Sequence, residues 1–321
     1  MGNCFCKQKR KMTDPPVVAV IGSTGYVGKC VMPSFLNSLK DGKLKELRVL
    51  TAPEKLNSEI IQSYVSAGAK AISVDYKQVS SVTTALNGVD VVVSTLGLGE
   101  GVEDVRTQLL DALVAAKVKL YFPSEYGANH YKFLNYNHPL FEGKRKHFKQ
   151  AKERGLNTIR MLTGGIMESI FGKLDCVSGV LTLAGNAADI PCAITAERDL
   201  GPFILEAIFL AYSDIAKCPD EIEVYSDMKT MREYANGFDK VSGLVTQIEQ
   251  VPLEEFKAEY EKSAKPFVKL LMIMFAEGAF DFSNATGNQL LNPNETVWKL
   301  KRIEEYAKET GGMPWKDGKA Q

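Results

Sequence analysis

The chain has 321 residues with 39 basic and 39 acidic side chains, so its formal net charge is zero. A nucleic-acid-binding protein needs a basic surplus to neutralise phosphates, and this balance argues against that class. Hydrophobic residues make up 45% of the chain and charged residues 24%, as in an ordinary globular protein. No apolar run approaches the roughly 18 residues of a membrane-spanning helix. The length predicts about two domains.

The first twelve residues, MGNCFCKQKRKM, form a basic leader without the apolar core of a secretory signal. This leader resembles a dual-acylation signal, with myristate on Gly2, palmitate on Cys4 or Cys6, and a polybasic patch for anionic lipid. Cys6 stands where myristoylation motifs favour Ser or Thr, so a plain flexible leader over residues 1–14 is the alternative. We expect a cytoplasmic protein, attached to the cytoplasmic face of a membrane if the leader is acylated.

The cysteines and histidines do not indicate a metal site. The six cysteines are scattered and none forms a CxxC pair, so reduced thiols are expected rather than a disulfide framework. His130, His138 and His147 are spaced by eight and nine residues, which is not a zinc-ligand spacing. The sequence therefore predicts no metal ion.

The first half of the chain alternates short apolar runs with helix-compatible segments. The apolar runs are Pro16–Ile21, Leu47–Leu50, Ala71–Val74, Val89–Ser94, Leu120–Phe122 and Thr158–Leu162. The expected helices are Tyr26–Leu39, Lys55–Ala67, Val102–Ala116 and Phe141–Arg154. Short apolar strands joined by helices form parallel sheets that are buried on both faces, with right-handed crossovers. The pattern predicts an α/β protein with a Rossmann-type, doubly wound parallel sheet over residues 15–165.

The alternation weakens after residue 165. The expected helices there are Glu197–Tyr212, Pro252–Lys265 and Phe267–Phe275, and the expected strands are Glu221–Tyr225 and Leu244–Val251. This mixture predicts a smaller α+β cap over residues 166–321 that forms the substrate-binding region.

A glycine-rich turn follows the first strand, where residues 18–28 read VAVIGSTGYVG. Gly22 suits a tight turn at the strand end, Gly25 leaves room for a pyrophosphate, and Gly28 lets the next helix pack closely. The helix N-terminus offers N–H groups and a partial positive charge to phosphates. The turn predicts dinucleotide binding because it joins a strand to a helix at the start of a βαβ alternation. The expected contacts are Gly22, Ser23, Thr24, Gly25, Tyr26, Val27 and Gly28.

Together with four further stretches, this turn resembles the NmrA-like and isoflavone-reductase-like group of atypical short-chain dehydrogenases. The stretches are GAKAISVDY (68–76), GVDVVVSTLG (88–97), LYFPSEYG (120–127) and FEGKRKHFKQAKERGLNT (141–158). The resemblance is clear over residues 17–169 and general beyond them, and Tyr126 stands where the family has Phe. It implies the same fold and further cofactor contacts at Asp75, Thr95, Leu96, Gly97, Pro123 and Ser124.

The end of the second strand bears on the choice of nicotinamide cofactor. An acidic residue there would bind the ribose diol of NAD, and LRVLTAPEK (47–55) has none at that point. NADP-preferring relatives usually carry an arginine near Thr51, and this chain lacks it. Lys55 and the Thr51 hydroxyl are the candidate contacts, while Arg48 lies inside the strand. By resemblance NADP(H) is favoured, and NAD(H) remains the alternative.

Lys144 stands where the resemblance places the lysine near the nicotinamide, and it is the candidate catalytic residue. On a helix it shares a face with Phe141, Phe148 and Ala151, an apolar position that a charged side chain does not ordinarily take. Leu140 occupies the position of the tyrosine in a Y-x-x-x-K pair, as in the tyrosine-less branch.

Two functions remain open from the sequence. The first is an NADP(H)-dependent oxidoreductase that acts on a small organic substrate, with Lys144 as its acid/base. The second is a non-catalytic NADP(H)-binding redox sensor that acts through a protein partner.

Overall fold

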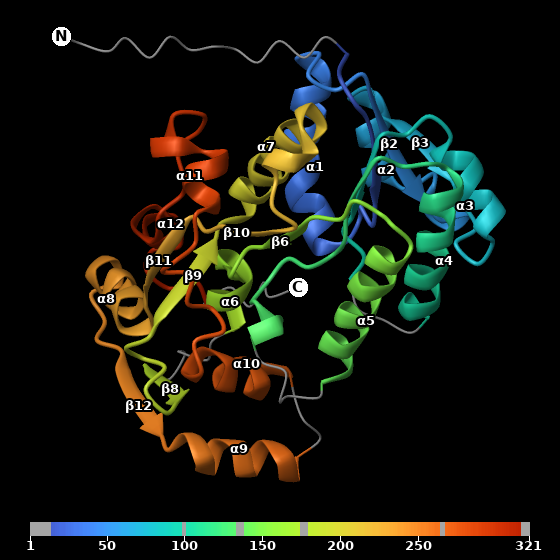
Figure 1. Ribbon diagram of the computed structural model, residues 1–321. Helices are drawn as coiled ribbons and strands as arrows, with labels where there is room; N and C mark the ends of the chain where they lie inside the picture. Colours follow the sequence, from blue (N-terminus) through green and yellow to red (C-terminus); the bar gives the residue numbers. More distant parts are fainter. Residues whose placement is uncertain (1–13, 98–100, 133–137, 174–178, 264–266, 316–321) are drawn as a thin grey trace.

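The computed structural model describes residues 14–97, 101–132, 138–173, 179–263 and 267–315 (Figure 1). The first half contains β1 (Val17–Ile21), α1 (Tyr26–Lys40), β2 (Glu46–Thr51), η1 (Pro53–Lys55), α2 (Glu59–Ser66), β3 (Lys70–Ser73), α3 (Val79–Leu86), β4 (Val91–Ser94), α4 (Val102–Ala115), β5 (Leu120–Phe122), η2 (His130–Lys132) and α5 (Pro139–Glu153). The strands of the second half are β6 (Arg160–Leu162), β7 (Gly165–Ile166), β8 (Val180–Ala184), β9 (Pro191–Thr195), β10 (Glu221–Glu223), β11 (Asp227–Thr230) and β12 (Gln247–Val251). Its helices are α6 (Met167–Lys173), α7 (Glu197–Ser213), η3 (Ile215–Lys217), α8 (Met231–Ser242), α9 (Leu253–Lys262), α10 (Phe267–Ala276), α11 (Gly287–Leu291), η4 (Pro293–Glu295) and α12 (Ile303–Glu309).

The main sheet has five parallel strands in the order β3-β2-β1-β4-β5. Strand order reverses between β1 and β4, so the chain winds outward in both directions, and the predicted doubly wound sheet is confirmed. Ligands of such sheets bind at the carboxyl ends of the strands beside this switch point.

Alternating side chains of the strands separate the core into two layers. Val18 and Val20 of β1 pack with residues of α1, α2 and α7 on one face. Ala19 and Ile21 pack with residues of α3, α4 and α5 on the other. Both faces of the sheet are buried, which explains the continuous apolar runs in the sequence.

The main sheet takes its strands from the first half of the chain, but one of the helices that cover it comes from the second half. α7, from the region expected to form the cap, packs along α1 and shares its core (Figure 1). The sixth apolar run, Thr158–Leu162, was expected to extend this sheet. Thr158 forms only a single parallel bridge to Tyr121 of β5, and β6 pairs with β10 instead.

A smaller α+β unit has its own core. β8 pairs with β12 in parallel, and β9 pairs with β7 and β11. Figure 1 shows α8, α9 and α10 grouped with β8 and β12 at the lower left, away from β2 and β3 at the upper right. Phe171, Tyr234 and Phe275 belong to this second core. α10, which brings apolar side chains to the cavity described below, is part of this unit.

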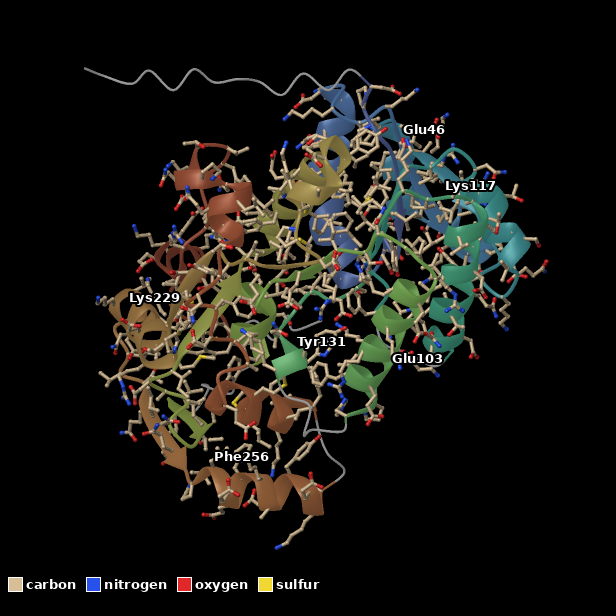
Figure 2. All side chains as sticks on the ribbon, in the orientation of Figure 1. Glu46, Glu103, Lys117, Tyr131, Lys229 and Phe256 are labelled. Atoms are coloured by element: carbon tan, nitrogen blue, oxygen red, sulfur yellow. The ribbon has the colours of Figure 1, made fainter. Side chains whose placement is uncertain are left out.

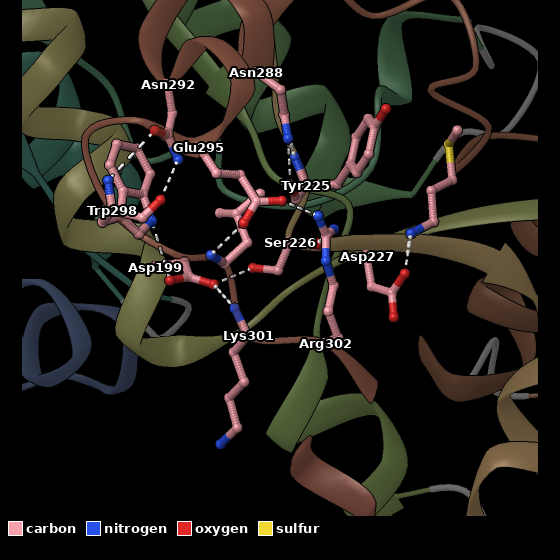
Figure 3. A network of polar contacts seen from close by, with 12 residues as sticks. Asp199, Tyr225, Ser226, Asp227, Asn288, Asn292, Glu295, Trp298, Lys301 and Arg302 are labelled. Atoms are coloured by element: carbon pink, nitrogen blue, oxygen red, sulfur yellow. Dashed lines mark hydrogen bonds and ion pairs between the residues drawn. The ribbon is translucent and has the colours of Figure 1, made fainter. Parts of the chain in front are cut away.

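A buried carboxylate joins α7 to the C-terminal segment (Figure 3). Asp199 Oδ2 accepts hydrogen bonds from the Ser226 hydroxyl (2.6 Å) and the Lys301 backbone N–H (2.9 Å), and Oδ1 accepts one from the Trp298 indole (3.2 Å). Burial raises the pKa of Asp199. All three partners donate, so the site requires an acceptor at each oxygen.

The change Asp199→Asn should lower the free energy of unfolding by about 1–3 kcal/mol, because its amide N–H group would face a donor and leave a buried group unpaired. Urea unfolding followed by circular dichroism measures this effect. The control is Glu254→Gln, since the Glu254 side chain is 85% exposed. A variant as stable as the wild type would show that the three donors do not need the carboxylate.

Candidate functional site

The turn between β1 and α1 requires two of its glycines for steric reasons. Gly22 has φ of +84°, and a Cβ there would lie 2.8 Å from the Thr95 carbonyl. A Cβ on Gly28 would lie 2.3 Å from the Gly22 oxygen. The backbone N–H of Gly25 donates to that same oxygen at 2.9 Å. These contacts hold the chain close to the end of β4.

Gly25 differs from the other two, because its backbone is extended, with φ of −74° and ψ of 175°. It is the N-cap of α1 and provides no side-chain cap, and the first turn of α1 carries no acidic residue. The N–H groups at this end of α1 therefore lack the usual side-chain acceptor. An exposed residue without a side chain, next to a helix N-terminus, fits a pyrophosphate.

A cavity of about 480 Å³ opens beside this turn. The predicted cofactor contacts that line it are Tyr26, Val27, Leu96, Gly97, Ser124 and Lys144. Most of the remaining wall is apolar, from β7, α5, α6, α10 and the segment after α10: Leu140, Phe141, Ile166, Ile170, Phe267, Val268, Leu271, Met272, Phe275 and Phe280. The cavity thus joins the carboxyl edge of the sheet to the α+β unit.

The other predicted contacts lie outside the cavity wall. They are Gly22, Ser23, Thr24, Gly25, Gly28, Thr51, Lys55, Asp75, Thr95 and Pro123. Ser23 is buried two residues after the end of β1, and Thr51 is buried at the end of β2. Lys55 is exposed in η1. Thr51 and Asp75 lie at or after the ends of β2 and β3, on the side of β1 where the adenosine half of a dinucleotide lies in this class of fold. Thr95 and Pro123 follow β4 and β5 on the other side of β1. Arg48 donates to the Ala85 and Asn87 carbonyls and is engaged away from that edge.

Lys144 projects from α5 into the cavity wall. It forms neither a hydrogen bond nor an ion pair with any other residue that the structure describes. Burial lowers its pKa, Glu125 opposes that shift, and Arg106 adds to it. A partly buried ammonium beside an apolar cavity, unpaired within the described residues, can donate a proton or orient a ligand oxygen.

A buried carboxylate–imidazole pair, which the sequence did not reveal, lies next to Lys144. Glu125 is 1% exposed, and its Oε2 lies 2.8 Å from Nε2 of His130. Burial lowers the pKa of His130, so the neutral ring donates its Nε2–H to the carboxylate. Burial alone would raise the pKa of Glu125, but the His130 hydrogen bond and the charge of Lys144 outweigh it and lower the pKa.

Aromatic rings fix the orientation of His130. The imidazole stacks on Tyr131 at 4.4 Å and on Phe141 at 4.9 Å between ring centroids. Tyr131 lies near the middle of the molecule in Figure 2. The Tyr131 hydroxyl also donates to Glu125 Oε1 at 3.4 Å. Glu125 lies in the PSEYG stretch that carries the family resemblance, but that stretch gives no sign of the contact with His130.

The other two histidines have structural contacts. His138 caps α5 by accepting from the Leu140 N–H at 3.3 Å. His147 is buried, its Nε2 lies 2.8 Å from the Tyr121 hydroxyl, and burial lowers its pKa to about 4. Within the described ranges no group of three or more His, Cys, Asp or Glu side chains could hold a metal ion. Cys30, Cys192 and Cys218 form no disulfide within those ranges.

The geometry defines a Rossmann-type fold with a lysine-bearing cavity at its switch point. The NmrA-like family model matches residues 15–307, and the chain therefore belongs to the NmrA-like family. The resemblance seen in the sequence is confirmed.

Two reductase-type proteins illustrate the similarity in sequence. Phenylcoumaran benzylic ether reductase TP7 of Nicotiana tabacum is 32% identical over 119 residues, 36% of this chain and 37% of that protein. The isoflavone reductase homolog IRL of Zea mays is 34% identical over 113 residues, 34% of this chain and 35% of that protein. The matched stretch thus spans little more than a third of these relatives.

Solved structures extend the likeness to almost the whole fold. AtPrR2 with NADP+ and (+)pinoresinol superposes with a TM-score of 0.78 at 20% identity, covering 93% of this chain and 99% of that one. The binary complex of leucoanthocyanidin reductase with NADPH from Vitis vinifera gives 0.73 at 18% identity, covering 92% and 99%. At these identities the likeness establishes the shared fold.

The leader lies outside the described residues, and so do Gly2, Cys4 and Cys6. Across the part of the chain that the structure describes, no helix is both long enough and apolar enough to cross a membrane.

Proposed function

We propose that this protein is an NADP(H)-dependent oxidoreductase of the isoflavone-reductase-like type, acting on a small organic substrate. The observation that carries the proposal is the Lys144 amine, which has no partner among the described residues and borders a cavity next to the glycine turn. The NADPH and NADP+ complexes among its structural neighbours support the choice of cofactor.

Different residues along the carboxyl edge of the sheet would bind the cofactor, orient the substrate and donate the proton. The turn from Gly22 to Gly28 would hold the pyrophosphate, and residues 95–97 would pass beside the nicotinamide ribose. Bound NADPH supplies a hydride. Lys144 would orient the substrate oxygen and donate a proton to it, and the apolar side chains of α5 and α10 would exclude water from the reacting atoms.

The direct test of the proposal is NADPH oxidation by the purified protein over a panel of phenylpropanoid and enone substrates, followed at the absorbance of the reduced cofactor. Turnover of at least one panel member is expected. NADPH binding without turnover, together with a protein partner captured only by the NADP-loaded form, would replace this proposal with a redox sensor.

We predict that the wild type binds NADPH more tightly than NADH, because β2 does not end in an acidic residue and the exposed Lys55 follows it as a candidate partner of the 2′-phosphate. Lys55→Ala should weaken NADPH binding roughly tenfold, since a charge-assisted contact contributes about 1.5 kcal/mol, and should leave NADH binding unchanged. Isothermal titration measures both affinities, with Lys240→Ala on α8 as the control. Equal affinities for the two cofactors in the wild type would refute the NADP preference.

We also propose that the leader is acylated at Gly2 and at Cys4 or Cys6. Each acyl chain contributes about 0.8 kcal/mol per buried CH₂, and each nearby Lys or Arg about 1 kcal/mol at an anionic surface. Protein expressed in a eukaryotic host should then fractionate with membranes, and Gly2→Ala should release it. Intact-mass measurement of the N-terminal peptide decides the question, because an unmodified Gly2 rules the acylation out.

A further inference from the structure

A second buried cation lies in the wall of the same cavity. Arg106, in the second turn of α4, is 4% exposed and borders the cavity together with Lys144. Its ion-pair partner Glu103 lies one turn earlier on α4, and that side chain is 58% exposed. Figure 2 shows Glu103 on the side of the molecule where α4 and α5 lie. The cation is therefore buried, while its counter-ion is largely in water.

The hydrogen bonds of Arg106 to the described residues use only part of its guanidinium. The group carries five N–H donors. One nitrogen donates to Glu103 and another donates to the Gly97 carbonyl at 3.2 Å. The remaining N–H groups have no acceptor among the described residues. A buried guanidinium is most stable when an anion takes these donors, and its planar fork matches a carboxylate in bidentate geometry.

The charges around the cavity also favour an anion. Lys144 has no ion pair within the described chain, so two cations border the space. Glu125 is the carboxylate on that wall, and its two oxygens already accept from His130 and Tyr131. Glu103, the counter-ion of Arg106, does not border the cavity and is largely in water, so a ligand carboxylate could compete with it for the guanidinium. Arg106 also lowers the pKa of Lys144, which is consistent with the two cations sharing one site.

The remaining side chains of the cavity wall indicate that the rest of the ligand is apolar. Phe141 of α5 and Phe267, Leu271 and Phe275 of α10 present apolar side chains to the same space. A ligand complementary to both Arg106 and the apolar wall is therefore amphipathic, with an apolar body and one carboxylate.

We propose that Arg106 is a specificity-determining residue that selects an apolar or aromatic carboxylate as substrate, binding its carboxylate while Lys144 serves the reacting oxygen. This assignment rests on the proposed reductase function and names the substrate class of that site. Arg106 holds the carboxylate without taking part in proton or hydride transfer.

The experiment measures binding with a matched pair of probes, 2-naphthoate and 2-naphthamide, which differ in charge and little in size. Each is titrated into the full-length protein with and without NADPH, by calorimetry. The wild type should bind naphthoate at least about tenfold more tightly than naphthamide, and Arg106→Gln should reduce that ratio to near one. Arg145→Gln is the matched control, because Arg145 follows Lys144 on α5 but does not border the cavity.

Two further variants keep the test decisive if Arg106→Gln folds poorly. Glu103→Gln removes the competing carboxylate and should tighten naphthoate binding, while Arg106→Lys keeps the charge without the fork and should give an intermediate ratio. Equal binding of the two probes by the wild type, or no binding of naphthoate, overturns the proposal. An Arg106→Gln protein that keeps the naphthoate preference but loses NADPH affinity also overturns it and assigns Arg106 to the cofactor. If the wild type does not bind NADPH, the reductase function is refuted, and this outcome is distinct from the probe comparison that tests Arg106.

Discussion

Gly25→Val should abolish NADPH binding and leave the protein folded. The Gly25 backbone, with φ of −74° and ψ of 175°, is one that valine adopts readily, and the residue is exposed. A Cβ there would lie 3.2 Å from the Gly22 oxygen, a tight contact that a small shift of the turn can relieve. The added methyl groups would occupy the space over the α1 N-terminus that a pyrophosphate needs. Calorimetric titration should detect no binding at NADPH concentrations that saturate the wild type.

Gly28→Ala provides the contrast, because the close backbone contacts of this glycine require it for packing. Its Cβ would lie 2.3 Å from the Gly22 oxygen and 2.6 Å from the Ser23 Cα, both backbone atoms that cannot yield cheaply. This variant should lose thermal stability, whereas Gly25→Val should melt within a few degrees of the wild type. NADPH binding by Gly25→Val at wild-type affinity would show that the cofactor does not cross the turn at this point.

Lys144→Ala should reduce turnover at least about tenfold, and up to about 10⁴-fold, with the fold unchanged. The expected loss follows from the amine, which borders the cavity and has no partner in the described chain. Steady-state kinetics on a substrate found in the panel measures the effect. Lys149→Ala is the matched control on the same helix, because its side chain is 78% exposed. Wild-type turnover by Lys144→Ala would remove Lys144 from the catalytic role.

The pH dependence of turnover provides a second readout for Lys144. If the ammonium is the proton donor, the rate falls as pH rises through its pKa. Burial lowers that pKa, so the falling limb should lie below the ordinary lysine value of about 10.4. The charge of Glu125 raises the pKa of Lys144, so Glu125→Gln should move the falling limb to lower pH. A limb that stays in place in Glu125→Gln would indicate that a different group titrates.

The sequence could predict the parallel sheet because its strands are buried on both faces and read as continuous apolar runs. It could not predict α3, where VSSVTTAL (79–86) is rich in β-branched residues and lacks a side-chain cap. β8, β9 and β11 were also missed, because β8 pairs with β12 and β9 with β11, partners well apart in the chain. Local pattern does not encode such pairings.

Some residues of the candidate site could also be predicted from the sequence, and others could not. The glycine turn and Lys144 stand in local motifs, and their positions could be read directly. Arg106 lies in a correctly predicted helix, but nothing local distinguishes a buried arginine on α4 from an exposed one. His130 is brought to Glu125 by the turn after β5, and stacking on Phe141 from a separate helix fixes its ring. Both roles depend on tertiary contacts.

The central claim is that the glycine turn and Lys144 belong to one NADP(H) site. A crystal structure of the wild type soaked with NADP+ tests this most directly. We expect the pyrophosphate to lie against Gly25 and the α1 N-terminus, with the nicotinamide in the cavity beside Lys144. A crystal at saturating NADP+ with an empty turn, or a nicotinamide placed away from Lys144, would contradict it.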